Sequence, residues 1–142
     1  MGNPFMPSTT RLMILTAALG TVAIGALAQG AKPALYTADQ ATAGANVYAQ
    51  SCGTCHGAMM EGTSAPALKG KDFTDVATAQ SMTADTLYDV ISSTMPQSDP
   101  GSLKPEEYAA VTAYILQQNG YPAGATALAK GAAGLKDAKI TP

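Results

Sequence analysis

The sequence predicts an all-α domain of three to four short helices. Two segments, 37–51 and 105–118, combine helix start and stop signals with apolar side chains spaced three and four residues apart. A third and shorter segment begins at Thr83 with the same kind of start signal. No segment reads as a convincing strand, so we expect helices packed on helices.

Ahead of these helices, residues 1–28 are typical of a secretory signal peptide. Arg11 is the one charged side chain in this segment, and 12–28 then run without a charge. Ala26-Leu27-Ala28 offers the small residues that a signal peptidase reads, which favours cleavage before Gln29. An uncleaved anchor is the alternative, although the 17 uncharged residues 12–28 lie at the lower edge of what spans a bilayer, where about 20 are usual.

We therefore expect an exported, periplasmic protein with a mature domain at 29–142, a core at about 37–124 and an Ala/Gly-rich tail at 125–142. Contact with a membrane is expected only if the N-terminal segment stays uncleaved. Removing 1–28 takes away Arg11, so the net charge of −2 becomes −3, with 7 Lys against 10 acidic side chains. This balance disfavours nucleic acid and anionic membrane surfaces as partners.

The first helix is predicted to run from Thr37 to about Ser51. Thr37-Ala38-Asp39-Gln40 reads as a capping box, in which the Thr37 hydroxyl accepts from a backbone N–H and Gln40 reaches back to the cap. Gly44 and Tyr48 share one face of this helix, and Gly44 has no side chain to keep a second helix away.

The partner helix is predicted over 105–118. Pro105 suits the first helical position, and the acidic residues after it complement the N-terminal dipole. Asn119-Gly120 then marks the end of the helix. The apolar face consists of Tyr108, Val111, Tyr114 and Ile115. We expect the two helices to cross near Gly44.

The segments between and after these helices are predicted to be less regular. Thr83 caps a short helix whose Leu87, Val90 and Ile91 face inward, and a loop follows over 92–103. The stretch 57–80 is expected to contain at most short helical turns. After Gly124 the chain is expected to form a surface-hugging or frayed tail.

The stretch Cys52-Gly-Thr-Cys55-His56 contains both cysteines and the only histidine of the chain. This pattern suits covalent haem attachment, in which the two sulfurs bond the porphyrin and His56 ligates the iron. A thioredoxin-like dithiol normally follows a strand, whereas a helix is predicted here. A zinc site wants about four ligands, and a Cys52–Cys55 disulfide would leave His56 unexplained. The motif therefore indicates a redox protein rather than a hydrolase.

With His56 as the only histidine, the sixth position on the iron must hold Met, Lys, a weaker oxygen donor or nothing. Of the methionines that survive cleavage, Met59 and Met60 follow His56 too closely to pass around the macrocycle. Met82 and Met95 remain, and Met95 is favoured because Pro96 pushes it toward an extended backbone. His/Met ligation raises the iron potential and fills both axial positions, which predicts one-electron transfer and no enzymatic activity.

A supporting acceptor for the other ring N–H of His56 is also expected. Metal-bound histidines usually donate this proton to a carboxylate or a carbonyl. The backbone carbonyl of Pro66, in the loop that follows the motif, could accept it.

Together these features resemble the small class I monohaem cytochromes c, from about Thr37 to Gly124. The resemblance rests on Gly44, Tyr48, Cys52-x-x-Cys55-His56-Gly57, Ala65-Pro66-Ala67-Leu68-x-Gly70, Met95-Pro96 and Tyr108-x-x-Val111-x-Ala113-Tyr114-Ile115-Leu116. It implies a cytochrome c fold around one covalently bound haem c. It assigns the thioether sulfurs to Cys52 and Cys55, the axial ligands to His56 and Met95, and the histidine-supporting carbonyl to Pro66.

Two positions depart from the pattern of that family. Thr94 stands where a glycine often precedes the ligand methionine, and Lys104 stands where a Ser or Thr cap is common. The resemblance implies redox partner proteins, with a dehydrogenase as electron donor and an oxidase or another cytochrome as acceptor. The alternatives are a membrane-tethered subunit of such a complex, or a haem catalyst or gas sensor with an open sixth site.

Overall fold

The computed structural model describes residues 1–2 and 31–142. The predicted cleavage point before Gln29 and nearly all of the predicted signal peptide therefore lie outside the described residues. Among the helices that are described, none has the length and apolar character needed to cross a membrane.

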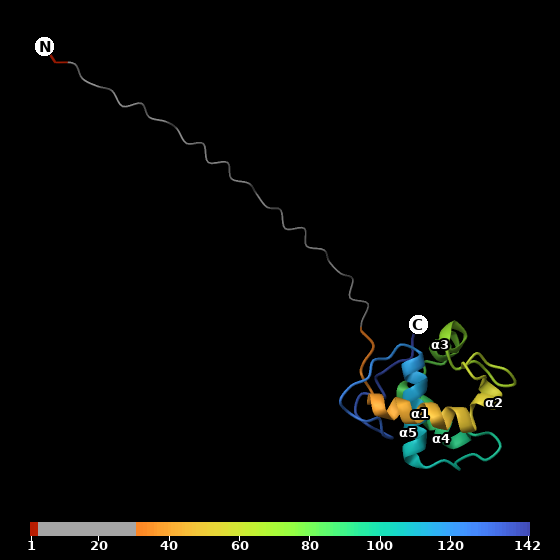
Figure 1. Ribbon diagram of the computed structural model, residues 1–142. Coiled ribbons are helices and arrows are strands. Elements are labelled where there is room, and N and C mark those ends of the chain that lie inside the picture. Colours follow the sequence, from red (N-terminus) through yellow and green to blue (C-terminus); the bar gives the residue numbers. More distant parts are fainter. Residues whose placement is uncertain (3–30) are drawn as a thin grey trace.

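The described residues contain five helices, which confirms the all-α class (Figure 1). They are α1 (Ala38–Ser51), α2 (Gly53–His56), α3 (Gly70–Ala79), α4 (Ala84–Thr94) and α5 (Pro105–Gln118). Within residues 31–142 the only β-type pairing is an isolated bridge between Thr83 and Lys139.

The first helix begins where the sequence predicts, but only half of the predicted capping box is formed. The Thr37 hydroxyl accepts from the Gln40 N–H at 3.3 Å. The Gln40 side chain does not return to the cap, so that part of the prediction is wrong. Its amide binds the backbone of Leu128 instead, through both its nitrogen and its oxygen.

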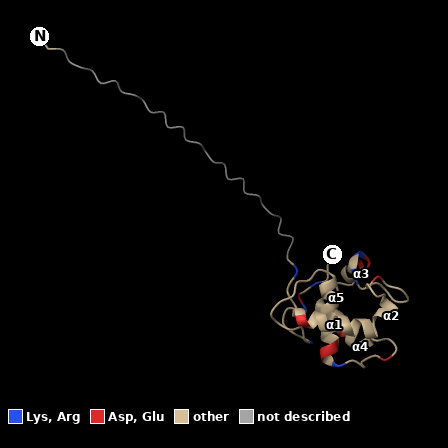
Figure 2. Cartoon of the chain, in the orientation of Figure 1, with Lys and Arg blue, Asp and Glu red and all other residues tan. Residues whose placement is uncertain are grey.

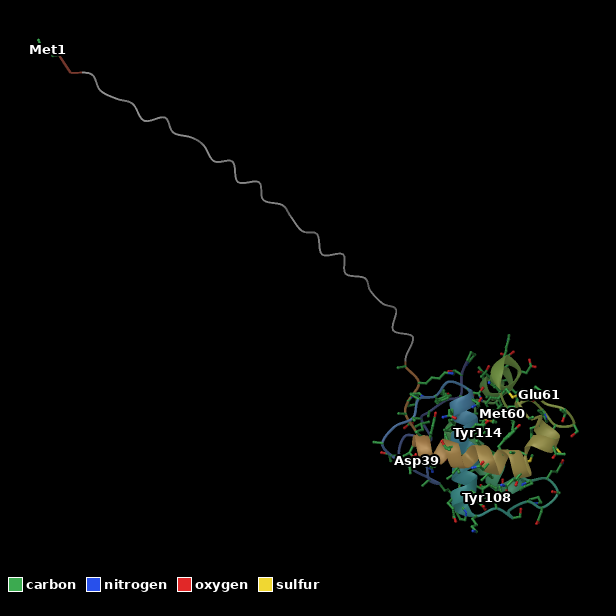
Figure 3. All side chains as sticks on the ribbon, in the orientation of Figure 1. Met1, Asp39, Met60, Glu61, Tyr108 and Tyr114 are labelled. Atoms are coloured by element: carbon green, nitrogen blue, oxygen red, sulfur yellow. The ribbon has the colours of Figure 1, made fainter. Side chains whose placement is uncertain are left out.

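The predicted crossing of α1 and α5 is confirmed (Figure 1). A Cβ atom added at Gly44 would lie 1.9 Å from the carbonyl oxygen of Ala110, so the two backbones touch here. Beside this contact, the rings of Tyr48 and Tyr114 pack edge to face with centroids 5.7 Å apart. Tyr114 is visible at the crossing in Figure 3.

The start of α5 compensates for the lysine at its cap. Pro105 occupies the first helical position, as predicted. The Glu107 carboxylate accepts from the Lys104 N–H at 2.8 Å. A carboxylate from the first turn thus satisfies a backbone donor at an end that lacks a Ser or Thr hydroxyl.

The ten-residue helix α3 corrects the expectation of short turns over 57–80. Phe73 and Ala77, four positions apart, are buried and give the helix an apolar stripe. Its first N–H, at Gly70, is accepted by the side chain of Asn119 at 3.1 Å. This distant acceptor helps to define where the helix begins.

Helix α4 starts as predicted but ends three residues later than expected. Thr83 and Thr86 form a reciprocal capping box. The helix continues to Thr94, so the loop begins at Met95 rather than at residue 92. Leu87 and Ile91 are buried as predicted, whereas 46% of the Val90 surface is exposed in the mouth of the cavity described below.

The tail after Gly124 lies against the helices and is not frayed. Leu128, Leu135 and Ile140 are at most 2% exposed and belong to the hydrophobic core. The surface-hugging form of the prediction is therefore the correct one, and the tail also contributes to the interior. Apolar residues in an otherwise Ala/Gly-rich segment supply these contacts.

Candidate functional site

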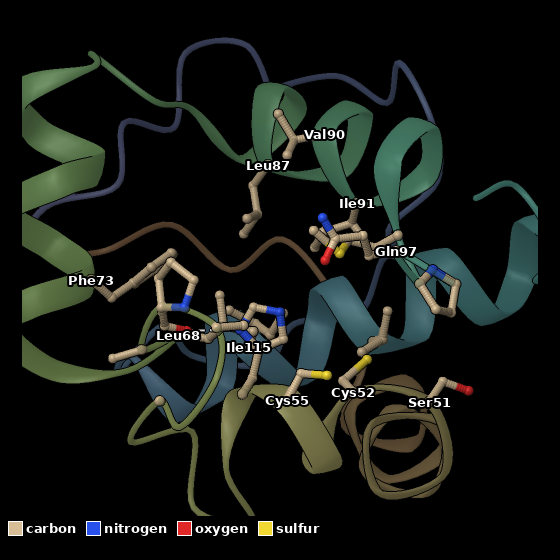
Figure 4. Close-up of a pocket in the computed structure, with 18 of the residues that line it drawn as sticks. Ser51, Cys52, Cys55, Leu68, Phe73, Leu87, Val90, Ile91, Gln97 and Ile115 are labelled. Atoms are coloured by element: carbon tan, nitrogen blue, oxygen red, sulfur yellow. Dashed lines mark hydrogen bonds between the residues drawn. The ribbon is translucent and has the colours of Figure 1, made fainter. Parts of the chain in front are cut away.

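A cavity of about 870 Å³ lies between α2, α3, α4 and α5 (Figure 4). Its size is near the upper end of ordinary cofactor pockets, which span roughly 300–1,000 Å³. The side chains that line it are mainly apolar. They include Leu68, Phe73, Val76, Leu87, Val90, Ile91, Val111 and Ile115. Charged side chains occur on α1, α3, α4 and α5 and on several loops (Figure 2), whereas α2 carries no Lys, Arg, Asp or Glu.

Cys52 and Cys55 lie at one wall of this cavity and are not joined by a disulfide. Their sulfur atoms face the open space in Figure 4. Burial raises the pKa of the Cys52 thiol to about 11, and the neighbouring charge of a Cys55 thiolate adds to this rise. Redox dithiols need the opposite shift, toward a more acidic thiol. The dithiol alternative is therefore disfavoured.

His56 also lines the cavity, and its ring is held by the predicted hydrogen bond. Its Nδ1 lies 2.7 Å from the carbonyl oxygen of Pro66. Because a carbonyl only accepts, Nδ1 carries the proton and donates it. The neutral ring then has its free lone pair on Nε2, which is the form that ligates a metal.

The backbone around His56 is fixed by further hydrogen bonds that the sequence pattern does not reveal. The Tyr48 hydroxyl donates to the carbonyl of Gly57 at 2.7 Å. The carbonyl of Cys55 accepts from the Thr63 hydroxyl and the N–H groups of Thr63 and Ala65. The loop that follows α2 is thereby folded back onto the motif.

Asn119 is a residue whose part in the site is not evident from the sequence. It is predicted only as a helix stop, yet its amide nitrogen donates to the carbonyls of Leu68 and Ile115 at 2.9 and 2.8 Å. Its oxygen accepts from the Gly70 N–H. Asn119 thus ties the end of α5 to the loop that contains Pro66. A buried polar residue at a helix end is a weak signal, because its partners are distant in sequence.

Met82 and Met95 line the cavity, whereas Met59 and Met60 do not. Met95 caps the C-terminus of α4 in the extended conformation expected before Pro96, with φ −121° and ψ 153°. Met59 is exposed, and Met60 is packed in the core. The cavity therefore leaves two methionines available, and Met95 retains the favoured backbone.

The Tyr108 hydroxyl closes the loop that begins at Met95. It donates to the Met95 carbonyl at 2.9 Å and accepts from the Leu103 N–H at 3.3 Å. Tyr108 lies in the first turn of α5 (Figure 3). One side chain thus joins both ends of the loop to α5.

Tyr108→Phe is expected to remove the two hydrogen bonds that hold the loop and to keep the buried aromatic ring. Each lost hydrogen bond should cost about 0.5–1.5 kcal/mol of unfolding free energy. Urea unfolding of the variant and of the parent protein measures the difference. Tyr114→Phe is the control, since that ring contributes packing to the crossing rather than a bond to the loop. Equal stability of Tyr108→Phe and the parent would contradict the assignment.

These residues fit a flat, apolar macrocycle that carries a metal. The sulfur atoms of Cys52 and Cys55 and the His56 ring, with its Nε2 available, lie at the α2 wall. The side chains of Met82 and Met95 line other parts of the cavity. The walls between them are apolar. In the described residues, no three Cys, His, Asp or Glu side chains gather into a metal site of their own. The donor set therefore suits a haem better than a bare zinc ion.

Comparisons with known proteins agree with this geometry. Residues 39–115, more than half of the chain, match the family model described as cytochrome c oxidase, cbb3-type, subunit III. The crystal structure of the sulfane dehydrogenase SoxCD from Paracoccus pantotrophus is similar, with a TM-score of 0.58 and 23% identity. The match covers 79% of this chain and 57% of the chain in that crystal structure. Because the identity is low, the match supports the fold alone. No curated protein matches the chain.

Proposed function

Because the chain belongs to the c-type cytochrome family described as cytochrome c oxidase, cbb3-type, subunit III, we propose that it carries single electrons through one covalently bound haem c. The observation that carries the proposal is the cavity wall at α2. Both thiols lie there beside a histidine whose Nδ1 is already engaged by Pro66.

Five of the residues that line the cavity have a defined role in this proposal. Cys52 and Cys55 hold the cofactor through thioether bonds, and His56 ligates the iron through Nε2. The Pro66 carbonyl keeps the imidazole in the required tautomer and orientation. Met95 supplies the sixth ligand. When bound, the haem supplies a one-electron redox couple whose potential His/Met ligation raises.

The same arrangement argues for a carrier rather than an enzyme. If His56 and Met95 both held the iron, a substrate or oxygen molecule would find no free position at the metal. The chain offers no second histidine as a distal acid or base. A haem catalyst or gas sensor is therefore the less favoured function.

The proposed partners are other redox proteins of the periplasm. The donor would be a dehydrogenase and the acceptor a terminal oxidase or another cytochrome. The family description names an oxidase subunit, and the similar solved structure is that of a dehydrogenase. These names also favour the second candidate, a cytochrome subunit that stays in a complex and that an uncleaved N-terminus could tether to the membrane.

Intact mass of the protein exported from cells with haem-ligation machinery tests the proposal and separates its two forms. Loss of residues 1–28 together with the added mass of one haem supports a soluble carrier. A mass that retains the N-terminus supports the tethered subunit. A colourless, unmodified polypeptide would refute both. Stopped-flow reduction by candidate dehydrogenases then identifies the donor.

Met95→Ala is expected to leave the haem attached but remove the thioether-to-iron absorption band and lower the reduction potential. Loss of a thioether ligand removes the feature that raises the potential. Optical spectra and a redox titration measure both effects. Met82→Ala is the matched control and should retain the band. If the band persists in Met95→Ala and disappears in Met82→Ala, the sixth ligand is Met82.

A further inference from the structure

The C-terminal segment 128–140, called the strap here, joins α1 to α4, the second of which borders the cavity. It lies beyond residues 39–115, the part of the chain that matches the family. Its apolar side chains Leu128, Leu135 and Ile140 are almost completely buried. Its polar backbone groups bond to the first turn of α1 and to the first turn of α4.

The strap is attached to α1 at a single side chain. The Gln40 amide nitrogen donates to the Leu128 carbonyl at 2.7 Å, and the Leu128 N–H donates to the amide oxygen at 2.8 Å. Two bonds to one residue fix both its position and its direction. The Leu128 side chain, 2% exposed, is packed in the core beside this junction.

The attachment to α4 involves the helix end itself. The first N–H groups of a helix have no acceptor within the helix. Here the N–H of Ala84 donates to the Ala138 carbonyl at 2.9 Å, and the N–H of Asp85 donates to the Leu135 carbonyl at 3.2 Å. The Ile140 N–H donates to Met82 just before the helix, at 2.9 Å. The strap therefore completes the cap that Thr83 begins.

The other end of α4 carries the proposed sixth ligand. Leu87 and Ile91 line the cavity along this helix, and Met95 is the residue at which it ends. A short helix moves as a rigid rod, so a shift of its first turn is transmitted to its last turn.

We propose that the strap is a positioning element that holds α4 against the start of α1 and thereby keeps Met95 on the iron. The inference rests on the proposed function, since it requires a bound haem with Met95 as ligand. Loosening the strap raises the rate at which Met95 leaves the metal. A small external ligand such as imidazole then enters the sixth position faster.

The test measures imidazole binding to the oxidised haem-loaded protein, followed through loss of the thioether absorption band. Gln40→Met removes both bonds to Leu128 and keeps the side-chain length, and Leu135→Ala removes a buried contact next to Asp85. Gln40→Met is expected to bind imidazole roughly tenfold faster, the factor that corresponds to the loss of about one net hydrogen bond or a little more. Leu135→Ala keeps the backbone bond from Asp85 but removes a buried side chain, and it is expected to bind imidazole at least as fast as Gln40→Met. Far-UV circular dichroism confirms that the helices are intact.

A matched control separates positioning from a general loss of stability. Leu116→Ala removes a buried leucine of α5 that does not line the cavity. At a similar loss of unfolding free energy, it should leave the binding rate near that of the parent. If the strap variants bind at the parental rate, or if Leu116→Ala accelerates binding equally, the inference is wrong.

Amide hydrogen exchange on the haem-loaded protein with its parental sequence gives a second test that needs no variant. The amides of Ala84 and Asp85 are expected to be as protected as that of Ile91 in the middle of α4, because the strap accepts from both. Rapid exchange at Ala84 and Asp85 would overturn the inference. Persistence of the thioether band in Met95→Ala would instead overturn the ligand assignment, so the two failures are distinguishable.

Discussion

Gly44→Ala is expected to destabilise the domain by about 3 kcal/mol or more, the upper end of what overpacking a core usually costs. The added Cβ would lie 1.9 Å from the Ala110 carbonyl oxygen and 2.9 Å from the Tyr114 Cβ. The first of these atoms belongs to a helix backbone and cannot turn aside as a side-chain tip can. The helices would have to separate, and the Tyr48–Tyr114 contact would be lost with them.

Urea unfolding followed by circular dichroism measures this effect. Gly53→Ala is the control, because its added Cβ would meet the Tyr48 carbonyl oxygen at 3.6 Å, an ordinary contact, and because its φ is not positive. A small domain has roughly 5–15 kcal/mol of stability in total, so the Gly44 variant should unfold at a clearly lower midpoint. An unchanged midpoint would place the closest approach of the helices elsewhere.

The second large effect is expected from the thiols. Cys55→Ala should prevent the normal double thioether attachment, because only the Cys52 sulfur remains at the cavity wall. Joint replacement of Cys52 and Cys55 by alanine should leave any bound haem extractable. A denaturing gel stained for haem and the intact mass of the purified protein measure attachment.

Thr54→Ala, placed between the two cysteines, is the matched control and should mature normally. The threonine is exposed, and its side chain forms no hydrogen bond among those found in the described residues. Haem that survives denaturation in the protein lacking both cysteines would refute the thioether assignment outright. Loss of attachment in Thr54→Ala would indicate that the maturation machinery requires the intervening residues themselves.

Features of the fold and of the site that depend on residues close together in the sequence, or on a missing side chain, can be predicted from the sequence. Thr37 and Pro105 mark helix starts by local hydrogen-bonding and backbone rules, and both are confirmed. His56 and Pro66 are ten positions apart, and their hydrogen bond is predictable because the loop that follows the motif can fold back onto the ring. The crossing at Gly44 is also predictable, because the absence of a side chain is itself a signal of close approach.

Other features depend on partners far away in the chain, and the sequence does not reveal them. Gln40 fits a capping box locally, but it bonds to Leu128 instead. Helix α3 lies in a stretch that mixes Gly, Pro, Ala and Lys, and its first N–H finds an acceptor in the side chain of Asn119. The tail has few large apolar side chains, and its burial follows from the surfaces that α1 and α4 offer to it. Local sequence patterns cannot predict contacts between residues that are far apart in the chain.

The contact between α1 and α5 also has a consequence for biogenesis. Helix α1 ends at Ser51 and α5 begins at Pro105, so their pairing joins residues far apart in the sequence and closes a long loop. A nascent polypeptide that stops before Pro105 has no partner for the face around Gly44. Pairing of these helices must therefore wait until α5 has been synthesised, and we expect translation products that stop before Pro105 to be degraded by proteases.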